Sequence, residues 1–191
     1  MEKASKLNLR QLGENLCKLG YREIESRLVG LHLDSDSLIQ LLNHKSRKVG
    51  DTAFSLLDRR SDGPQLVVEA ILSDRFTHKI AKIRATNFLA GRGRSCPEAM
   101  KAYLHLLCDR NAEVVGNALF GVVFFQDQTQ MDLLERRRDA LPARDEVRTE
   151  LEGAIRALRE ENPFLFSPGF HDAGDVWKLD RRRFGDRIGK L

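Results

Sequence analysis

The chain has 191 residues, of which 41% are hydrophobic and 31% are charged, and its formal net charge is +4. This composition is typical of a folded protein with a well-solvated surface, and it excludes an intrinsically disordered chain. No apolar run reaches the roughly eighteen residues of a transmembrane helix. Basic residues are spread along the chain, so we expect neither a basic nucleic-acid-binding arm nor a membrane partner.

The three cysteines, Cys17, Cys96 and Cys108, are odd in number and form no CxxC motif. A disulfide framework needs an even number of cysteines, so reduced thiols are the simplest interpretation. Reduced thiols, together with a start at Met1 that lacks the apolar core of a secretion signal, predict a cytoplasmic protein.

Apolar residues recur at the i, i+3, i+4 and i+7 spacing of amphipathic helices, and no stretch alternates as a strand does. An atypical helix pair is expected over residues 7–31. Turn residues then separate later segments at Asp62-Gly63-Pro64, at the Gly-Arg-Gly-Arg run of 91–94 and at Pro142. The further helices are expected in pairs: 37–43 with 47–58, 65–73 with 79–90, 97–108 with 112–125, and 130–141 with 145–159.

These pairs are copies of one pattern. Laid 65 residues apart, the segment 39–42 matches 104–107, and in the same register Val49 falls on Val114. Equivalent apolar positions at Val49, Ile83, Val114 and Val147 are 34, 31 and 33 residues apart. A period of this length predicts a solenoid with one helix pair per repeat.

The segment 106–119 resembles a HEAT repeat, in which Leu-x-Asp ends the first helix and Val-Arg-x-x-Ala opens the second. The resemblance covers about residues 34–160 and departs from the pattern at His44, Gly50, Asn87 and Val115. It implies an all-α fold, a right-handed α-solenoid of antiparallel helix pairs with an irregular C-terminal cap. The implied divisions are an N-terminal cap pair at 1–33, four HEAT-like repeats at 34–160, and a C-terminal tail at 161–191 that packs on the last repeat.

The repeat frame also predicts which side chains are buried. In the tail, Phe164, Phe166 and Trp177 are expected to pack on the last repeat, because exposing three aromatic side chains to water is unfavourable. The alternative is that the tail is a docking peptide for a partner, since Trp, Phe and Arg commonly anchor interfaces. The positions expected in the core are Leu42, Val49, Ala53, Leu72, Ile83, Leu107, Val114, Ala118, Val147 and Leu151.

Two surfaces are candidate contact sites. One is the groove lined by the second helices, with Arg84, Phe88, Phe120 and Val123 as anchors and Asp51, Ser55 and Arg148 as the rim. For Phe120 the competing interpretation is the core, because helix 112–125 is apolar on all sides. The other is a basic turn ridge, formed by basic residues at the turns between the first and second helix of each pair. The competing interpretation is that these side chains are simply solvated. Besides Arg84, the ridge comprises Lys45, Arg47, Lys48, Lys79, Lys82 and Arg110.

No nucleophile elbow, Walker loop or dinucleotide-binding glycine motif occurs in the sequence, so we expect no catalytic residues. His105 and Cys108 share a helix face, but two ligands make no metal site; neither a metal nor another cofactor is expected. These features predict a non-catalytic protein-binding module: a scaffold, an adaptor, or an immunity-type inhibitor that neutralises a cognate toxin. The alternative is a nucleic-acid-binding protein, of which the HEAT-like DNA glycosylases are one kind.

Overall fold

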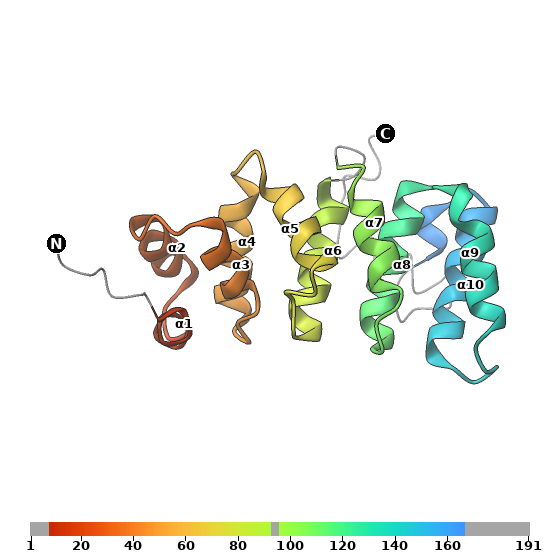
Figure 1. The fold of residues 1–191 in the computed structure, drawn as a ribbon, viewed down its shortest axis with the longest axis horizontal. Coiled ribbons are helices and arrows are strands. Elements are labelled where there is room, and N and C mark those ends of the chain that lie inside the picture. Colours follow the sequence, from red (N-terminus) through yellow and green to blue (C-terminus); the bar gives the residue numbers. More distant parts are fainter. Residues whose placement is uncertain (1–7, 93–95, 167–191) are drawn as a thin grey trace. The chain divides into compact units, whose positions relative to one another are not determined.

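The computed structural model describes residues 8–92 and 96–166 (Figure 1). Within these residues all regular structure is helical, which confirms the predicted all-α class. The chain divides into two compact units, Met1–Phe88 and Leu89–Leu191, which we call unit 1 and unit 2. The division falls inside one helix, α6 (Lys79–Arg92).

The helices follow one another in pairs, close to the ranges expected from the sequence. Unit 1 contains α1 (Leu9–Leu16), α2 (Tyr21–Gly30), α3 (Ser35–Leu42), α4 (Arg47–Asp58), α5 (Gly63–Leu72) and the first part of α6. Unit 2 contains α7 (Ala99–Leu106), α8 (Ala112–Phe125), α9 (Met131–Asp139) and α10 (Glu146–Arg159), with short 3₁₀ helices η2 (Gln128–Gln130) and η3 (Pro163–Leu165).

We call the odd-numbered helices A helices and the even-numbered ones B helices. Within a pair, α3 packs on α4, α7 on α8 and α9 on α10. Between successive pairs of unit 1, A helices contact A helices (α1 with α3, α3 with α5) and α2 contacts α4. In unit 2 the B helices α8 and α10 pack together.

Short polar residues at the helix ends explain why the boundaries could be predicted. Asp34 precedes α3 and accepts a hydrogen bond from the Ser37 backbone N–H at 2.7 Å, and Asn111 and Asp145 cap α8 and α10 in the same way. Such caps satisfy backbone donors that have no partner inside the helix. At the other end, a left-handed residue follows the last turn of α10, where Glu161 has φ 51°.

Polar side chains also join one helix pair to the next at separations close to the sequence period. Asn43, after α3, donates from Nδ2 to the Arg75 carbonyl at 2.9 Å, and its Oδ1 accepts from the Thr77 N–H at 2.9 Å. In unit 2, Gln126, directly after α8, donates from Nε2 to the carbonyl of Glu161, which follows α10, at 3.3 Å. These contacts fix neighbouring pairs against each other within each unit.

Most of the predicted core is confirmed. Ile83 and Val147 are half-buried, whereas the expectation for Leu72 was wrong, since this side chain is 41% exposed. Leu72 lies on the side of α5 that carries the exposed Gln65 and Glu69, at the i, i+4 and i+7 spacing of one helix face. The expected core residues that are buried are Leu42, Val49, Ala53, Leu107, Val114, Ala118 and Leu151.

The largest fully buried side chain is Tyr103 of α7, in unit 2. Its ring lies over Gly121 of α8, where a Cβ atom would come within 2.4 Å of the ring carbon Cζ. The ring edge also packs on Phe125, with 5.9 Å between ring centroids. The hydroxyl is buried and has no hydrogen-bond partner among residues 8–92 and 96–166. Burial is the main cause that raises the pKa of Tyr103, and the nearby Cys96 adds to it.

Replacing Tyr103 with phenylalanine is therefore expected to stabilise unit 2 by about 1 kcal/mol, because it removes an unsatisfied buried hydroxyl and keeps the ring. Tyr103→Leu, which also removes the contact with Phe125, should destabilise it. Urea unfolding followed by far-UV circular dichroism measures both changes. A loss of more than about 1 kcal/mol on Tyr103→Phe would show that the hydroxyl has a partner, such as a bound water.

The segment after α10 packs back on the B helices of unit 2. The short helix η3 contacts both α10 and α8. Phe166 is 2% exposed, and a Cβ atom on Gly153 of α10 would lie 3.2 Å from its ring. Phe166 thus packs as expected, whereas Phe164 is 50% exposed and Trp177 lies outside the described residues.

Candidate functional site

The predicted groove residues fall in both units. Unit 1 holds Asp51, Ser55, Arg84 and Phe88, and unit 2 holds Phe120, Val123 and Arg148. The structure brings Asp51 and Arg84 into direct contact in unit 1.

Asp51 of α4 is the centre of a polar cluster on unit 1. Its Oδ2 accepts from Tyr21 Oη of α2 at 3.3 Å and from Arg47 Nε at 3.2 Å. Its Oδ1 pairs with Arg84 Nε of α6 at 3.2 Å. One carboxylate therefore ties together side chains from three successive B helices.

Arg84 is the least exposed member of this cluster. Its side chain is 11% exposed, and its guanidinium lies over Gly50, where a Cβ atom would be 2.3 Å from Nη1. Nη1 also donates to the His44 carbonyl at 3.2 Å. Burial lowers the pKa of Arg84, and the Asp51 carboxylate opposes that shift. Arg84 is therefore a support beneath the surface rather than the exposed anchor that we expected.

His44 has a structural role between α1 and the α3–α4 turn. A Cβ atom on Gly13 would lie 2.5 Å from His44 Cδ2, and His44 Nδ1 accepts from the Ser46 N–H at 3.1 Å. Burial lowers its pKa, the Glu14 charge opposes this, and Arg84 adds to it. The imidazole therefore fills space left by a glycine on the neighbouring helix.

The same surface of unit 1 extends to residues that the sequence analysis did not select. Glu25 of α2 forms an ion pair with Arg59, directly after α4, and Val29, one turn beyond Glu25, is exposed. Ser55 is exposed and lies one turn from Asp51 and one turn from Arg59. We define the α2–α4 surface as Tyr21, Glu25, Val29, Arg47, Asp51, Ser55 and Arg59. Its two cross-helix contacts span 30 and 34 residues, so extending the repeat period back to α2 could have found it.

Phe88 is half-buried. Its ring stacks on the buried Phe54 of α4, with 5.3 Å between ring centroids and 31° between ring planes. This contact joins α4 to α6 in unit 1, so Phe88 contributes at least in part to packing.

On α8 of unit 2 the exposed side chains differ from the prediction. Val123 is 1% exposed, so it belongs to the core, and its assignment as an anchor was wrong. Phe120 is half-buried, and Phe124, which we did not select, is 42% exposed. The Phe120 and Phe124 rings lie 6.1 Å apart. The aromatic pair on α8 is therefore Phe120 with Phe124.

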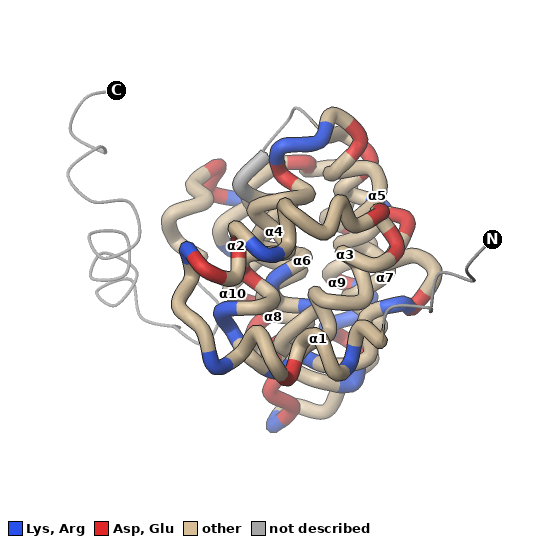
Figure 2. The backbone as a smooth tube through the Cα atoms, turned by 90° about the vertical axis from the view of Figure 1, so that its left-hand side faces the viewer, with Lys and Arg blue, Asp and Glu red and all other residues tan. Residues whose placement is uncertain are grey.

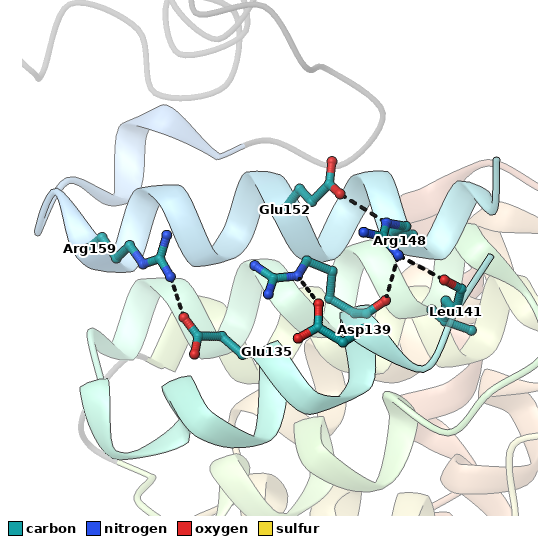
Figure 3. A network of polar contacts seen from close by, with 7 residues as sticks. Glu135, Asp139, Leu141, Arg148, Glu152 and Arg159 are labelled. Atoms are coloured by element: carbon teal, nitrogen blue, oxygen red, sulfur yellow. Dashed lines mark hydrogen bonds and ion pairs between the residues drawn. The ribbon is translucent and has the colours of Figure 1, made fainter. Parts of the chain in front are cut away.

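Arg148 of α10 closes the turn between α9 and α10 (Figure 3). Its Nη1 donates to the carbonyls of Leu141 at 2.9 Å and Arg138 at 3.3 Å, and its Nε pairs with Glu152 at 3.1 Å. At the other end of the helix, Arg159 pairs with Glu135 of α9. Arg148 thus satisfies carbonyls at the end of α9, a mainly structural task.

The basic turn ridge is only partly available to a partner. Lys48 Nζ donates to the Leu19 carbonyl at 2.6 Å, and Arg47 and Arg84 both pair with Asp51. Lys82 is half-buried, while Lys45, Lys79 and Arg110 are exposed. Figure 2 shows basic and acidic residues interspersed along the described parts of the tube.

Comparisons of this chain with protein-family models, curated proteins and solved structures found no match. Among the described residues, no helix combines the length and the apolar composition that crossing a membrane requires. The same part of the chain holds no group of three or more His, Cys, Asp or Glu side chains placed to bind one metal ion. Cys17, Cys96 and Cys108 carry free thiols.

Proposed function

We propose that this chain is a non-catalytic protein-binding module whose contact surface lies on its B helices. The observation that carries this proposal is that Tyr21 and Arg47 are exposed and are nevertheless held in place by one shared carboxylate, Asp51. Tyr and Arg are enriched among the residues that dominate binding energy at protein interfaces. A scaffold, an adaptor and an immunity-type inhibitor of a cognate toxin are the forms such a module takes.

For the fold as a whole we propose a right-handed, HEAT-like α-solenoid. Three features support it: the packing of A on A helices in unit 1, the packing of B on B helices in both units, and the polar contacts between residues about one repeat apart. The free thiols support a cytoplasmic location, where cysteines stay reduced.

A protein partner is favoured over a nucleic acid by the charges near the turns. A phosphate backbone is bound by several accessible cations, each of which displaces counterions. Here Lys48 bonds to a backbone carbonyl, and Asp51 neutralises part of the charge of Arg47 and Arg84. In unit 1 the exposed Val29 adds apolar contact area that suits a protein.

The test places a photo-crosslinking amino acid at Ser55 of α4 or, as a matched control, at Gln40 of α3. Both positions are exposed, but one lies on a B helix and the other on an A helix. In a lysate of the source cell, the Ser55 variant is expected to form a discrete protein adduct that excess unmodified chain suppresses. The Gln40 variant should form none.

Equal adducts from both positions, or none from Ser55, would count against a B-helix contact surface. A parallel salt titration with a random DNA duplex tests the alternative. Duplex binding that weakens steeply with salt would favour the nucleic-acid function instead.

A further inference from the structure

We infer that the α2–α4 surface binds an acidic segment of the protein partner, with a carboxylate of that segment bound by Arg47 beside the ring of Tyr21. This inference rests on the proposed function and specifies the chemistry of the partner. It follows from the way the cluster is built, from its charge, and from the apolar side chain next to it.

Hydrogen bonds and ion pairs connect the His44 backbone, through Arg84 and Asp51, to the side chains of Tyr21 and Arg47. Arg84 Nη1 donates to the His44 carbonyl at 3.2 Å, and Arg84 Nε pairs with Asp51 Oδ1 at 3.2 Å. The other oxygen of Asp51, Oδ2, accepts hydrogen bonds from Arg47 Nε and Tyr21 Oη. Side chains that are already ordered lose less conformational entropy when a partner binds. Tyr21 and Arg47 are therefore pre-organised for a contact.

The cluster has an excess of positive charge. Two guanidinium groups, Arg47 and Arg84, share the single carboxylate of Asp51, and the exposed Lys45 precedes Arg47 by two residues. The Arg47 side chain is 85% exposed, and its bond to Asp51 uses only Nε. The other N–H donors of a guanidinium match the two oxygens of a carboxylate. An anionic group is therefore the complementary ligand for Arg47.

The neighbouring residues favour a protein carboxylate over a nucleic-acid phosphate. Tyr21, Glu25 and Val29 lie one turn apart along α2, and Tyr21 and Val29 are each 48% exposed. An extended phosphate backbone that followed this row would meet the Glu25 carboxylate and an apolar valine. A peptide that combines acidic and aliphatic side chains meets a cation at Arg47 and an apolar contact at Val29.

The experiment is an NMR titration of the full chain with a short capped peptide of glutamates and leucines. The same peptide with glutamine in place of every glutamate is the uncharged control. We expect the acidic peptide to shift the backbone amides of Tyr21, Arg47 and Asp51 in a saturable way, and the glutamine peptide to leave them unchanged. Arg47→Glu is expected to weaken the binding about tenfold.

A matched control variant is Arg10→Glu. Arg10 is 89% exposed and pairs with Glu14 one turn along α1, so it shares the exposure and the local pairing of Arg47 without belonging to the cluster. It should change the affinity by less than about twofold. Because Arg47→Glu places a like charge one turn from Asp51, Arg47→Gln is the second variant, and circular dichroism checks that both remain helical.

Three results would overturn the inference: no shifts at α2 and α4, equal losses for Arg10→Glu and Arg47→Glu, or tighter binding of a DNA duplex than of the acidic peptide at the same amides. The Ser55 crosslink and the peptide titration together distinguish a failure of this inference from a failure of the proposed function. An adduct at Ser55 that is insensitive to Arg47→Gln would retain the protein-binding function and reject the acidic partner. Saturable binding of the acidic peptide without any Ser55 adduct would support the anion preference and reject the protein-binding function.

Discussion

Replacing Phe166 with alanine is expected to lower the free energy of unfolding of unit 2 by about 3 kcal/mol. The ring is 2% exposed and packs against Gly153, and the segment before it contacts α8 and α10. Truncating a buried ring forfeits its transfer free energy and leaves a cavity that the helices fill only in part. Urea unfolding followed by circular dichroism measures the loss, and faster hydrogen exchange in α10 would locate it.

Phe164→Ala is the matched control, because it removes the same atoms two residues away from a side chain that is 50% exposed. We expect it to cost less than about 1 kcal/mol, as exposed substitutions usually do. Similar losses for the two variants would mean that Phe166 does not pack on α10 as described, and the segment would then be better interpreted as a docking peptide.

The positions of the helices could be predicted because the signals are local. Helices expected over 47–58 and 112–125 are observed as Arg47–Asp58 and Ala112–Phe125. Each begins after a polar residue, Ser46 or Asn111. Turn and cap residues act within a few positions along the chain, so a single sequence contains them completely.

The exposed face of each helix was harder to predict. On α8, Val123 and Phe124 lie on opposite sides of Phe120, by about 60° and 40° around the helix axis. The helical periodicity places Val123 and Phe124 on either side of Phe120. It does not show which of the two sides a neighbouring helix covers. In the structure Val123 is covered and Phe124 is exposed. Leu72 was misassigned for another reason: it shares a face of α5 with the polar Gln65 and Glu69, a local signal that the repeat alignment did not use.

Asp51 and Arg84 were predicted as groove residues, but the polar cluster that joins them was not predicted. We expected Asp51 at the rim and Arg84 as an exposed anchor, whereas Asp51 is the centre of the cluster and the largely covered Arg84 supports it from below. Ion pairing across helices depends on three-dimensional packing, which the sequence does not contain directly. One signal was nevertheless present: Gly50 occupies the repeat position of Arg84 in the preceding copy, and its missing side chain leaves room for the guanidinium.

Because of that arrangement, Arg84→Ala is expected to cause the second large loss, a cost of about 2 kcal/mol to unit 1. The substitution leaves Asp51 with Arg47 and Tyr21 but without its buried partner, and it removes the bond to the His44 carbonyl. It also empties the space above Gly50. Urea unfolding measures the change. Arg47→Ala is the control, since it breaks an ion pair to the same carboxylate from an exposed side chain and should cost less than about 1 kcal/mol.

A double-mutant cycle with Gly50→Ala tests the packing itself. In the wild-type chain the added methyl group would meet Arg84 Nη1 at 2.3 Å, so the guanidinium must move from Asp51 and the chain should lose stability. In the Arg84→Ala chain that obstacle is gone, and alanine should stabilise α4 by up to about 1 kcal/mol, because it favours a helix over glycine. The effect of Gly50→Ala therefore reverses sign between the two backgrounds. If Gly50→Ala changed the free energy of unfolding in the same direction in both backgrounds, Arg84 would not lie over Gly50. Arg84 and Asp51 would then not order Tyr21 and Arg47 before a partner binds.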